Sequence, residues 1–432
     1  MIIFSKTIFV SLFIYFLNLA SLFSQNTQDT IVYVNLTSIN PNADDNDLQQ
    51  LDPYFENVKV IAIGESTHGT SEFSVMRHRM FKYLVKHHGF NTFFLEADYA
   101  NCLRTNAYIH GEKDNITNVV NEISLWPWMT EEMVDLVNWM RTYNAKNLNN
   151  QLNFIGVDMQ QYVETVKKID NILQKNKLPI TDSVIFQSML DTNFFLITKK
   201  EDLEIYKTVW EEKKAIDISQ FNKGDKRVYS LLLRHLTQIL GEKYGWEKYQ
   251  DNRDYRMAEN ILYHLDQDTI AKGFFWAHNG HICHIMPKKK RSGTAGGHLK
   301  KELENLYFSI GLDFDEGSFN AFYPDTKSTR IMEGKAYTLG AVTVGKSPTG
   351  SVASTFRHIN TPTFVEYQSL LNKNKYIKMN DIGAAYYPTK TTKQKSIAHN
   401  QMFGGNGFDA LILIKKSTPT HLLKNKKIET EK

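Results

Sequence analysis

The stretch VKVIAIGESTHGTSEF, from Val58 to Phe73, joins an apolar run to a polar turn. Five of its first six residues are apolar, which is typical of a buried strand. Gly64 ends that run, and Glu65, His68 and Glu72 then follow within eight positions. The stretch therefore predicts a scaffold strand that carries acidic and basic side chains at its exit.

The pattern of a strand followed by a helix recurs along the chain. Further strands are predicted at 91–97, 152–158, 271–278, 306–322 and 408–414, and helices at 71–88, 101–111, 131–146 and 160–176. Gly89 is placed to stop the first helix, and Thr130 to cap the helix that starts at Glu131. This alternation predicts an α/β fold with a mainly parallel sheet flanked by helices.

The order of these segments predicts one large domain. We expect an α/β domain over residues 58–415, with a linker or extension over residues 25–57 before it. Residues 180–268 are charged and helix-periodic without a strand signal, which predicts a helical insertion that shapes a cleft. The basic residues 416–432 are expected to form a disordered tail.

The N-terminal segment predicts export. Residues 1–24 contain one early lysine, an apolar stretch of signal-peptide length and small residues before Gln25. Cleavage near Ser24 would release a periplasmic or secreted protein. The alternative is a membrane anchor formed by the same uncleaved segment.

Composition narrows the class of partner. The 432 residues are 42% hydrophobic and 23% charged, with a formal net charge of +4. Such a balance creates no strong field, so nucleic acid is not the expected partner. The two cysteines, Cys102 and Cys283, could form one bridge or stay as two buried free thiols.

Polar side chains stand at the ends of four predicted strands. Glu65, with His68 a turn later, follows the first; the other three end in Glu96, Asp158 and His278. In open parallel sheets, ligands bind outside the carboxyl ends of the strands. We therefore expect these side chains to share one cleft.

Arg77 lies on the apolar stripe of the first predicted helix, so its guanidinium needs a carboxylate partner. Glu65 and Glu96 are the natural candidates, because this helix begins beside both strand exits. The ion pair could orient the fold, clamp the carboxylates of the site, or do both.

Water activation is the chemistry that these residues favour. A neutral imidazole can take a proton from water near pH 7, and a carboxylate beside it stabilises the imidazolium. Glu65 and His68 could form that pair, and His278 or Arg77 could stabilise an oxyanion. A GxSxG nucleophile motif is absent around Ser66. The spacing of His278 and His281 only weakly suggests a metal.

Several ordered motifs resemble the erythromycin esterase family. They are GESTHGTSEF, Arg77, FFLEAD, WPWMTEEM, FIGVDMQ, NRDYRMAEN, AHNGH, GGHLKKEL, YFSIGLDFDEGSF and FDALI, from about Val58 to Ile414. The resemblance implies a macrolide-ring esterase, an antibiotic-resistance activity, that hydrolyses a small-molecule lactone ester without a metal or other cofactor.

The resemblance also implies roles for individual residues. His68 would be the general base, Glu65 and Glu96 would orient it, and Arg77 and His278 would complete the catalytic set. The residues expected to line the cleft are Glu72, Asp158, Arg253, His281, Trp126 and Trp128. The alternative is a metal-dependent hydrolase of another ester or amide, built from the same glutamate and histidine cluster.

Overall fold

The computed structural model describes residues 30–178, 188–189, 211–244, 253–285, 293–325, 331–332, 335–371, 376–386, 401–404 and 407–424. The predicted signal segment, residues 1–24, lies outside this set, as does part of the predicted insertion. Among the helices that the structure describes, none is long and apolar enough to cross a membrane.

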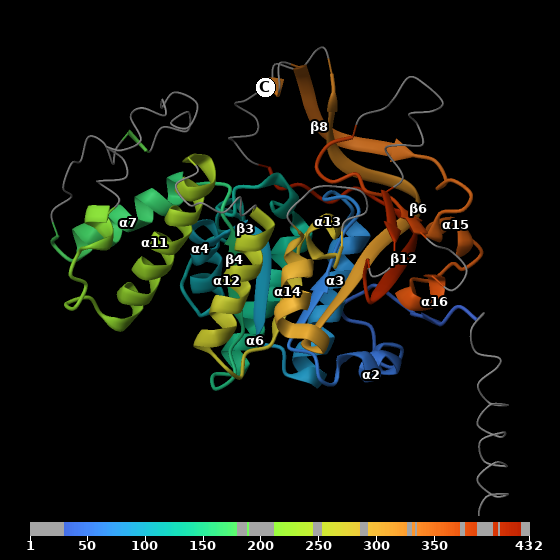
Figure 1. Ribbon diagram of the computed structural model, residues 1–432, viewed down its shortest axis with the longest axis horizontal. Helices are drawn as coiled ribbons and strands as arrows, with labels where there is room; N and C mark the ends of the chain where they lie inside the picture. Colours follow the sequence, from blue (N-terminus) through green and yellow to red (C-terminus); the bar gives the residue numbers. More distant parts are fainter. Residues whose placement is uncertain are drawn as a thin grey trace, which may run out of the picture.

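A central sheet organises the molecule (Figure 1). Its main path runs β1 (Tyr33–Asn35), β9 (Thr363–Glu366), β12 (Ala410–Ser417), β6 (Tyr307–Pro324), β2 (Val60–Ile63), β5 (Gly273–Trp276), β3 (Thr92–Asp98) and β4 (Asn153–Asp158). The neighbours from β12 to β4 are parallel, whereas β1 and β9 are antiparallel additions at one edge. The predicted mainly parallel sheet is therefore confirmed, with an antiparallel part that the sequence did not indicate.

Three further strand pairs are antiparallel. The long strand β6 pairs with β8 (Lys335–Val344), which pairs with β7 (Ile331–Met332), and β10 (Tyr376–Met379) pairs with β11 (Gln401–Gly404). The β6 and β8 ribbon projects beyond the parallel core in Figure 1.

Helices cover both faces of the sheet, and others pack beside it (Figure 1). They are α2 (Asp52–Phe55), α3 (Ser71–His88), α4 (Tyr99–Ile109), α5 (Ile116–Asn121), α6 (Glu131–Lys146), α7 (Val163–Lys175), α11 (Lys223–Tyr244), α12 (Arg253–Gln267), α13 (Asn279–Ile282), α14 (Ala295–Leu303), α15 (Val352–Thr355) and α16 (Tyr367–Leu371), with 3₁₀ turns η1 (Leu48–Leu51), η2 (Trp126–Trp128) and η4 (Glu304–Leu306).

Successive strand residues face opposite layers. Phe93 and Phe274 belong to the apolar cluster that includes residues of α3 and α6, whereas Phe94 and Phe275 belong to the cluster with residues of α12 and α14. Because a strand alternates its side chains, both faces must be apolar when both are covered. This explains why the strands are continuous apolar runs.

The two predicted helix boundaries are confirmed. Helix α3 ends at Gly89, which adopts φ 71°, and the side chain of Thr130 accepts a hydrogen bond from the amide of Met133 at the start of α6. A left-handed glycine and a threonine cap each satisfy backbone groups that a helix end leaves unpaired.

The two described helices of the predicted insertion pack in different places. Helix α11 packs against α7 and α4 and builds a third apolar cluster, which includes Leu236 and Ile169. Helix α12 packs against β4 and α14 and so belongs to the layer that covers the sheet. The end of this segment therefore carries residues directly to the exits of the strands.

The predicted disordered tail is wrong for residues 416–424. Strand β12 continues to Ser417, and the next residues lie across the starts of α3 and α6. The amide of Ser71 donates to the carbonyl of Thr418 at 2.9 Å, and the amide of Thr420 donates to the carbonyl of Gly69 at 2.9 Å. Backbone pairing therefore fixes a segment that its basic composition marked as solvated.

The predicted linker is also partly built into the domain. Strand β1 joins the sheet beside β9, and Asp47 forms a buried ion pair with Arg79 at 2.6 Å. Cys102 and Cys283 are both free and buried.

Candidate active site

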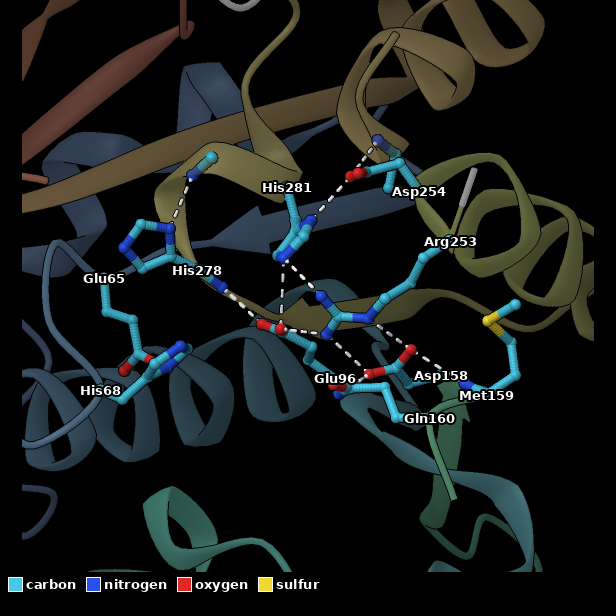
Figure 2. Close-up of polar contacts among 12 residues, drawn as sticks. Glu65, His68, Glu96, Asp158, Met159, Gln160, Arg253, Asp254, His278 and His281 are labelled. Atoms are coloured by element: carbon cyan, nitrogen blue, oxygen red, sulfur yellow. Dashed lines mark hydrogen bonds and ion pairs between the residues drawn. The ribbon is translucent and has the colours of Figure 1, made fainter. Parts of the chain in front are cut away.

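The four predicted strand exits lie side by side. Strands β2, β5, β3 and β4 are consecutive parallel neighbours, so Glu65, His278, Glu96 and Asp158 reach the same edge of the sheet (Figure 2). The sheet order that brings them together is not readable from any single strand.

Glu65 and His68 form a close pair in the turn after β2. Nδ1 of His68 lies 2.6 Å from Oε1 of Glu65, and Nη2 of Arg77 donates to Oε2 of the same carboxylate at 2.5 Å. Burial acts to raise the pKa of Glu65, but the charges of Arg77 and His68 lower it below its ordinary value. The carboxylate is thus held ionised and accepts a hydrogen bond from Nδ1–H of His68.

Aromatic rings surround this pair. The guanidinium of Arg77 stacks 3.7 Å over the ring of Trp276, and burial lowers the pKa of Arg77 to about 10. The ring of Trp128 meets His68 edge-on, with 5.9 Å between centroids. The side chain of His68 keeps 12% of its surface exposed, and no described residue forms a hydrogen bond with its Nε2. That nitrogen is consequently available to a ligand.

A second cluster forms around Arg253, the first residue of α12 (Figure 2). Its Nε and Nη2 donate to the two oxygens of Asp158 at 2.8 and 2.7 Å, and Nη2 also lies 2.5 Å from Oε1 of Glu96. Burial acts to raise the pKa of Glu96, but the charges of His281 and Arg253 hold it well below its ordinary value. Arg253 therefore forms ion pairs with two buried carboxylates at once.

His281 lies between this cluster and the helix layer. Its Nδ1 is 2.7 Å from Oδ1 of Asp254, and its Nε2 is 3.3 Å from Oε1 of Glu96 and 3.0 Å from Nη1 of Arg253. Burial acts to lower the pKa of His281, but Glu96 and the hydrogen bond to Asp254 raise it to about 10. The carboxylates of Glu96 and Asp254 thus favour the charged ring, whereas Nη1 of Arg253, which can only donate, favours an unprotonated Nε2.

His278 stands between the two clusters in Figure 2. Its amide donates to Oε2 of Glu96 at 2.8 Å, and its ring centroid lies 5.2 Å from that of His68. The amide of Gly280 donates to Nδ1 at 3.1 Å, so the neutral ring carries its proton on Nε2. Burial lowers the pKa of His278, which favours that neutral form.

Two residues expected in the cleft have other contacts. The carboxylate of Glu72 accepts hydrogen bonds from the amide and hydroxyl of Thr418 at 2.7 and 2.6 Å. Trp126 packs edge-on against Phe322. Glu72 therefore anchors the segment after β12, and nothing among the described contacts joins it to His68.

Sequence reasoning missed two aspartates of the site. Asp254 binds His281, and Oδ1 of Asp381 lies 3.4 Å from Nε2 of His278. Asp254 adjoins Arg253 in the motif NRDYRMAEN, so that motif held a signal. Asp381 comes from a loop far along the chain and had none.

Within the described ranges, no three or more His, Cys, Asp or Glu side chains are arranged to hold a metal ion. The acidic side chains of the second cluster instead surround the guanidinium of Arg253, and Nδ1 of His68 is engaged by Glu65. The donor set that the metal-dependent alternative requires is thus largely occupied by other partners.

Comparison with known proteins identifies the family. The family model described as erythromycin esterase matches residues 85–417, which is more than half of the chain. The chain belongs to the erythromycin esterase family. We expected the resemblance to begin near Val58, whereas the family match begins after Glu65, His68 and Arg77; the contacts described above join those residues to the rest of the site.

The relatives and solved structures that match this chain are only distantly similar to it in sequence. The chain is 25% identical to erythromycin esterase type II of Escherichia coli over 333 residues, which is 66% of this chain and 76% of that protein. A Bacillus cereus protein of known structure superimposes with a TM-score of 0.73 at 23% identity, covering 91% of this chain and 97% of its own. A variant of erythromycin esterase EreC in its open conformation gives 0.61 at 14% identity, covering 91% and 100%. The structural matches establish a shared α/β fold.

Proposed function

We propose that the chain is a carboxylic ester hydrolase that opens the lactone ring of a macrolide with water activated by His68. The observation that carries the proposal is the 2.6 Å contact between Glu65 and Nδ1 of His68, which leaves Nε2 without a hydrogen-bond partner among the described residues. The family and the relative named as an erythromycin esterase support the choice of substrate.

The first step is water attack on the ester carbonyl. Nε2 of His68 takes a proton as the water oxygen bonds to the carbonyl carbon, and the carboxylate of Glu65 stabilises the imidazolium. Arg77 keeps that carboxylate ionised and fixed in place. The negative charge then develops on the carbonyl oxygen, where Nε2–H of the neutral His278 acts as a hydrogen-bond donor.

The second step breaks the ester. The bond between the carbonyl carbon and the ring oxygen cleaves as the carbonyl re-forms, and His68 returns its proton to the leaving alkoxide. The products are one carboxylic acid and one alcohol on the opened ring, so the net change is the addition of one water molecule. His68 ends in its starting form.

Mass spectrometry of erythromycin incubated with the purified protein tests this proposal. We expect a product heavier by one water from the wild type. Glu72→Gln is the control and should give the same product, because the carboxylate of Glu72 binds Thr418 and has no described contact with His68. His68→Gln should slow the reaction by about 10² to 10⁴-fold. Equal rates for His68→Gln and the wild type would refute the mechanism, and complete loss of wild-type activity after chelation would favour the metal-dependent alternative.

A further inference from the structure

A short segment late in the chain holds the turn that carries His68. The amides of Ile382 and Gly383 both donate to the carbonyl of Ser66, at 2.8 and 3.2 Å, and the amide of His68 donates to the carbonyl of Gly383 at 3.2 Å. Residues 380–383, called the 380–383 segment below, are therefore bound directly to the turn that carries His68.

Asn380 anchors this segment to the sheet. Its side-chain amide donates to Oδ1 of Asp313 and to the carbonyl of Phe314, both at 2.8 Å, and the side chain is buried. Asp313 and Phe314 belong to β6, the strand beside β2. The position of residue 381 is consequently fixed by the same sheet that positions Glu65.

Asp381 extends from this anchor toward His278. Its Oδ1 lies 3.4 Å from Nε2 of His278, and the carbonyl of Ser66 lies 3.5 Å from the same nitrogen. The two side chains are only 13% and 12% exposed. Both acceptors are at the long end of the hydrogen-bond range. A closer and stronger acceptor can therefore replace them as the partner of Nε2–H.

Both nitrogens of the His278 ring are then held. Gly280 donates to Nδ1 at 3.1 Å on one side, and on the other side Nε2–H lies near two acceptors, Oδ1 of Asp381 at 3.4 Å and the carbonyl of Ser66 at 3.5 Å. The second-nitrogen partner of a histidine determines which tautomer faces the reacting group. Without Asp381, Nε2 would keep only the distant carbonyl of Ser66, so the ring would be held less firmly at that end.

We propose that Asp381 is a positioning residue that keeps the ring of His278 turned so that its Nε2 proton stays beside His68. This inference rests on the proposed ester hydrolysis, in which that proton is donated to the developing oxyanion. Asp381 acts through its acceptor oxygen and does not contact the substrate. An amide at this position should therefore replace it, whereas a methyl group should not.

Asp381→Ala and Asp381→Asn test the proposal, with Asp45→Ala as a control that removes a carboxylate bound to Lys86 at the surface. We expect Asp381→Ala to lower kcat by about 10-fold with KM nearly unchanged. Asp381→Asn and Asp45→Ala should keep kcat within about threefold of the wild type.

Nuclear magnetic resonance of the ¹⁵N-labelled histidines gives a readout that does not depend on activity. His278 is assigned by comparison with His278→Gln. Because Gly280 still donates to Nδ1, we expect the Nε2–H tautomer in all three proteins, but a shifted and broadened Nε2 resonance in Asp381→Ala alone. An Nε2 resonance in Asp381→Ala that keeps the wild-type position and width would overturn the inference, whether or not the wild type hydrolyses esters.

The pH at which His278 titrates supplies a third readout. The groups that face His278 are His68, Glu96, His281 and Asp381, and burial lowers its pKa while Asp381 raises it. Asp381→Asn should therefore move the pKa of His278 further down. An absence of any wild-type ester activity would refute the proposed function alone, because the resonance measurement still decides the role of Asp381.

Discussion

At the scale of the single residue, Arg253 shows how the site tolerates its own charge. Glu96 and Asp158 have side chains that are only 6% and 0% exposed, and one guanidinium bridges them. A buried carboxylate without a partner destabilises the folded protein by several kcal/mol. Removing Arg253 should therefore lower the stability by more than the net contribution of its ion pairs. A planar fork with several donors suits this position better than an ammonium group would.

Arg253→Met should lower the free energy of unfolding by about 3 to 5 kcal/mol near pH 7, because Glu96 and Asp158 lose their shared partner. The pKa of Glu96 is lower in the folded protein than in the unfolded chain. Its ion pairing therefore stabilises the protein fully at pH values above the unfolded pKa, and this stabilisation is lost as the pH falls through the folded pKa. In the variant, Glu96 can take up a proton at higher pH. The difference in free energy of unfolding between the variant and the wild type should therefore decrease as the pH falls from 7 to about 4.

Urea denaturation at several pH values measures this difference. Arg104→Met is the matched control, since Arg104 also bridges two carboxylates, those of Asp114 and Glu122, but its side chain is 36% exposed. It should cost about 1 kcal/mol or less. A cost for Arg253→Met no larger than that of the control would show that the cluster is solvated like a surface pair.

At the scale of the element, the turn that carries His68 is held by segments that are distant in sequence. The amide of Asn320, in β6, donates to the carbonyl of Gly69 at 3.0 Å, and the amide of Thr420 donates to the same carbonyl at 2.9 Å. A Cβ on Gly69 would lie 2.1 Å from the carbonyl oxygen of Asn320, so only glycine allows this approach. The turn is therefore placed by tertiary contacts, and these contacts require glycine at position 69.

A chain that ends at Ser417 should be less stable than one that ends at Lys424. The deletion removes backbone hydrogen bonds that Ser71, Glu131, Thr420 and Leu423 make across this boundary. At about 1 kcal/mol for each bond, the free energy of unfolding should fall by roughly 2 to 5 kcal/mol. Thermal unfolding measures the loss, and hydrogen exchange should show the amide of Ser71 newly exposed.

The chain that ends at Lys424 is the control, because it lacks only residues beyond those that the structure describes. Equal stability of the two shortened chains would mean that residues 418–424 rest on the domain without supporting it. Slow exchange at Ser71 in the shorter chain would lead to the same conclusion.

The sequence predicted those parts of the site that local pattern controls. Apolar runs located the strands, and polar residues at their ends located Glu65, Glu96, Asp158 and His278. Asp381 could not be predicted, because its approach to His278 depends on Asn380 binding β6. The antiparallel edge and the ordered segment after β12 likewise depend on long-range pairing, which leaves no periodic signal in a single sequence.

At the scale of the whole molecule, the sheet separates two apolar layers that each contain one cysteine. Cys102 belongs to the cluster with residues of α3 and α6, and Cys283 to the cluster with residues of α12 and α14. Their exposed fractions are 1% and 0%. A disulfide requires two close and mutually directed side chains, so the sheet between them prevents a bridge in the folded state.

Both thiols should therefore report unfolding of the whole domain. Burial raises the pKa of Cys102 and of Cys283, and only the thiolate reacts with disulfide reagents. Ellman's reagent should leave the native protein essentially unmodified at pH 8 and titrate both cysteines in denaturant. Because two thiols in two layers are shielded by one fold, they should become reactive together at rates that follow unfolding. Cys102→Ala and Cys283→Ala assign the two signals, and rapid reaction of one thiol in the native protein would mean that its layer opens independently of the other.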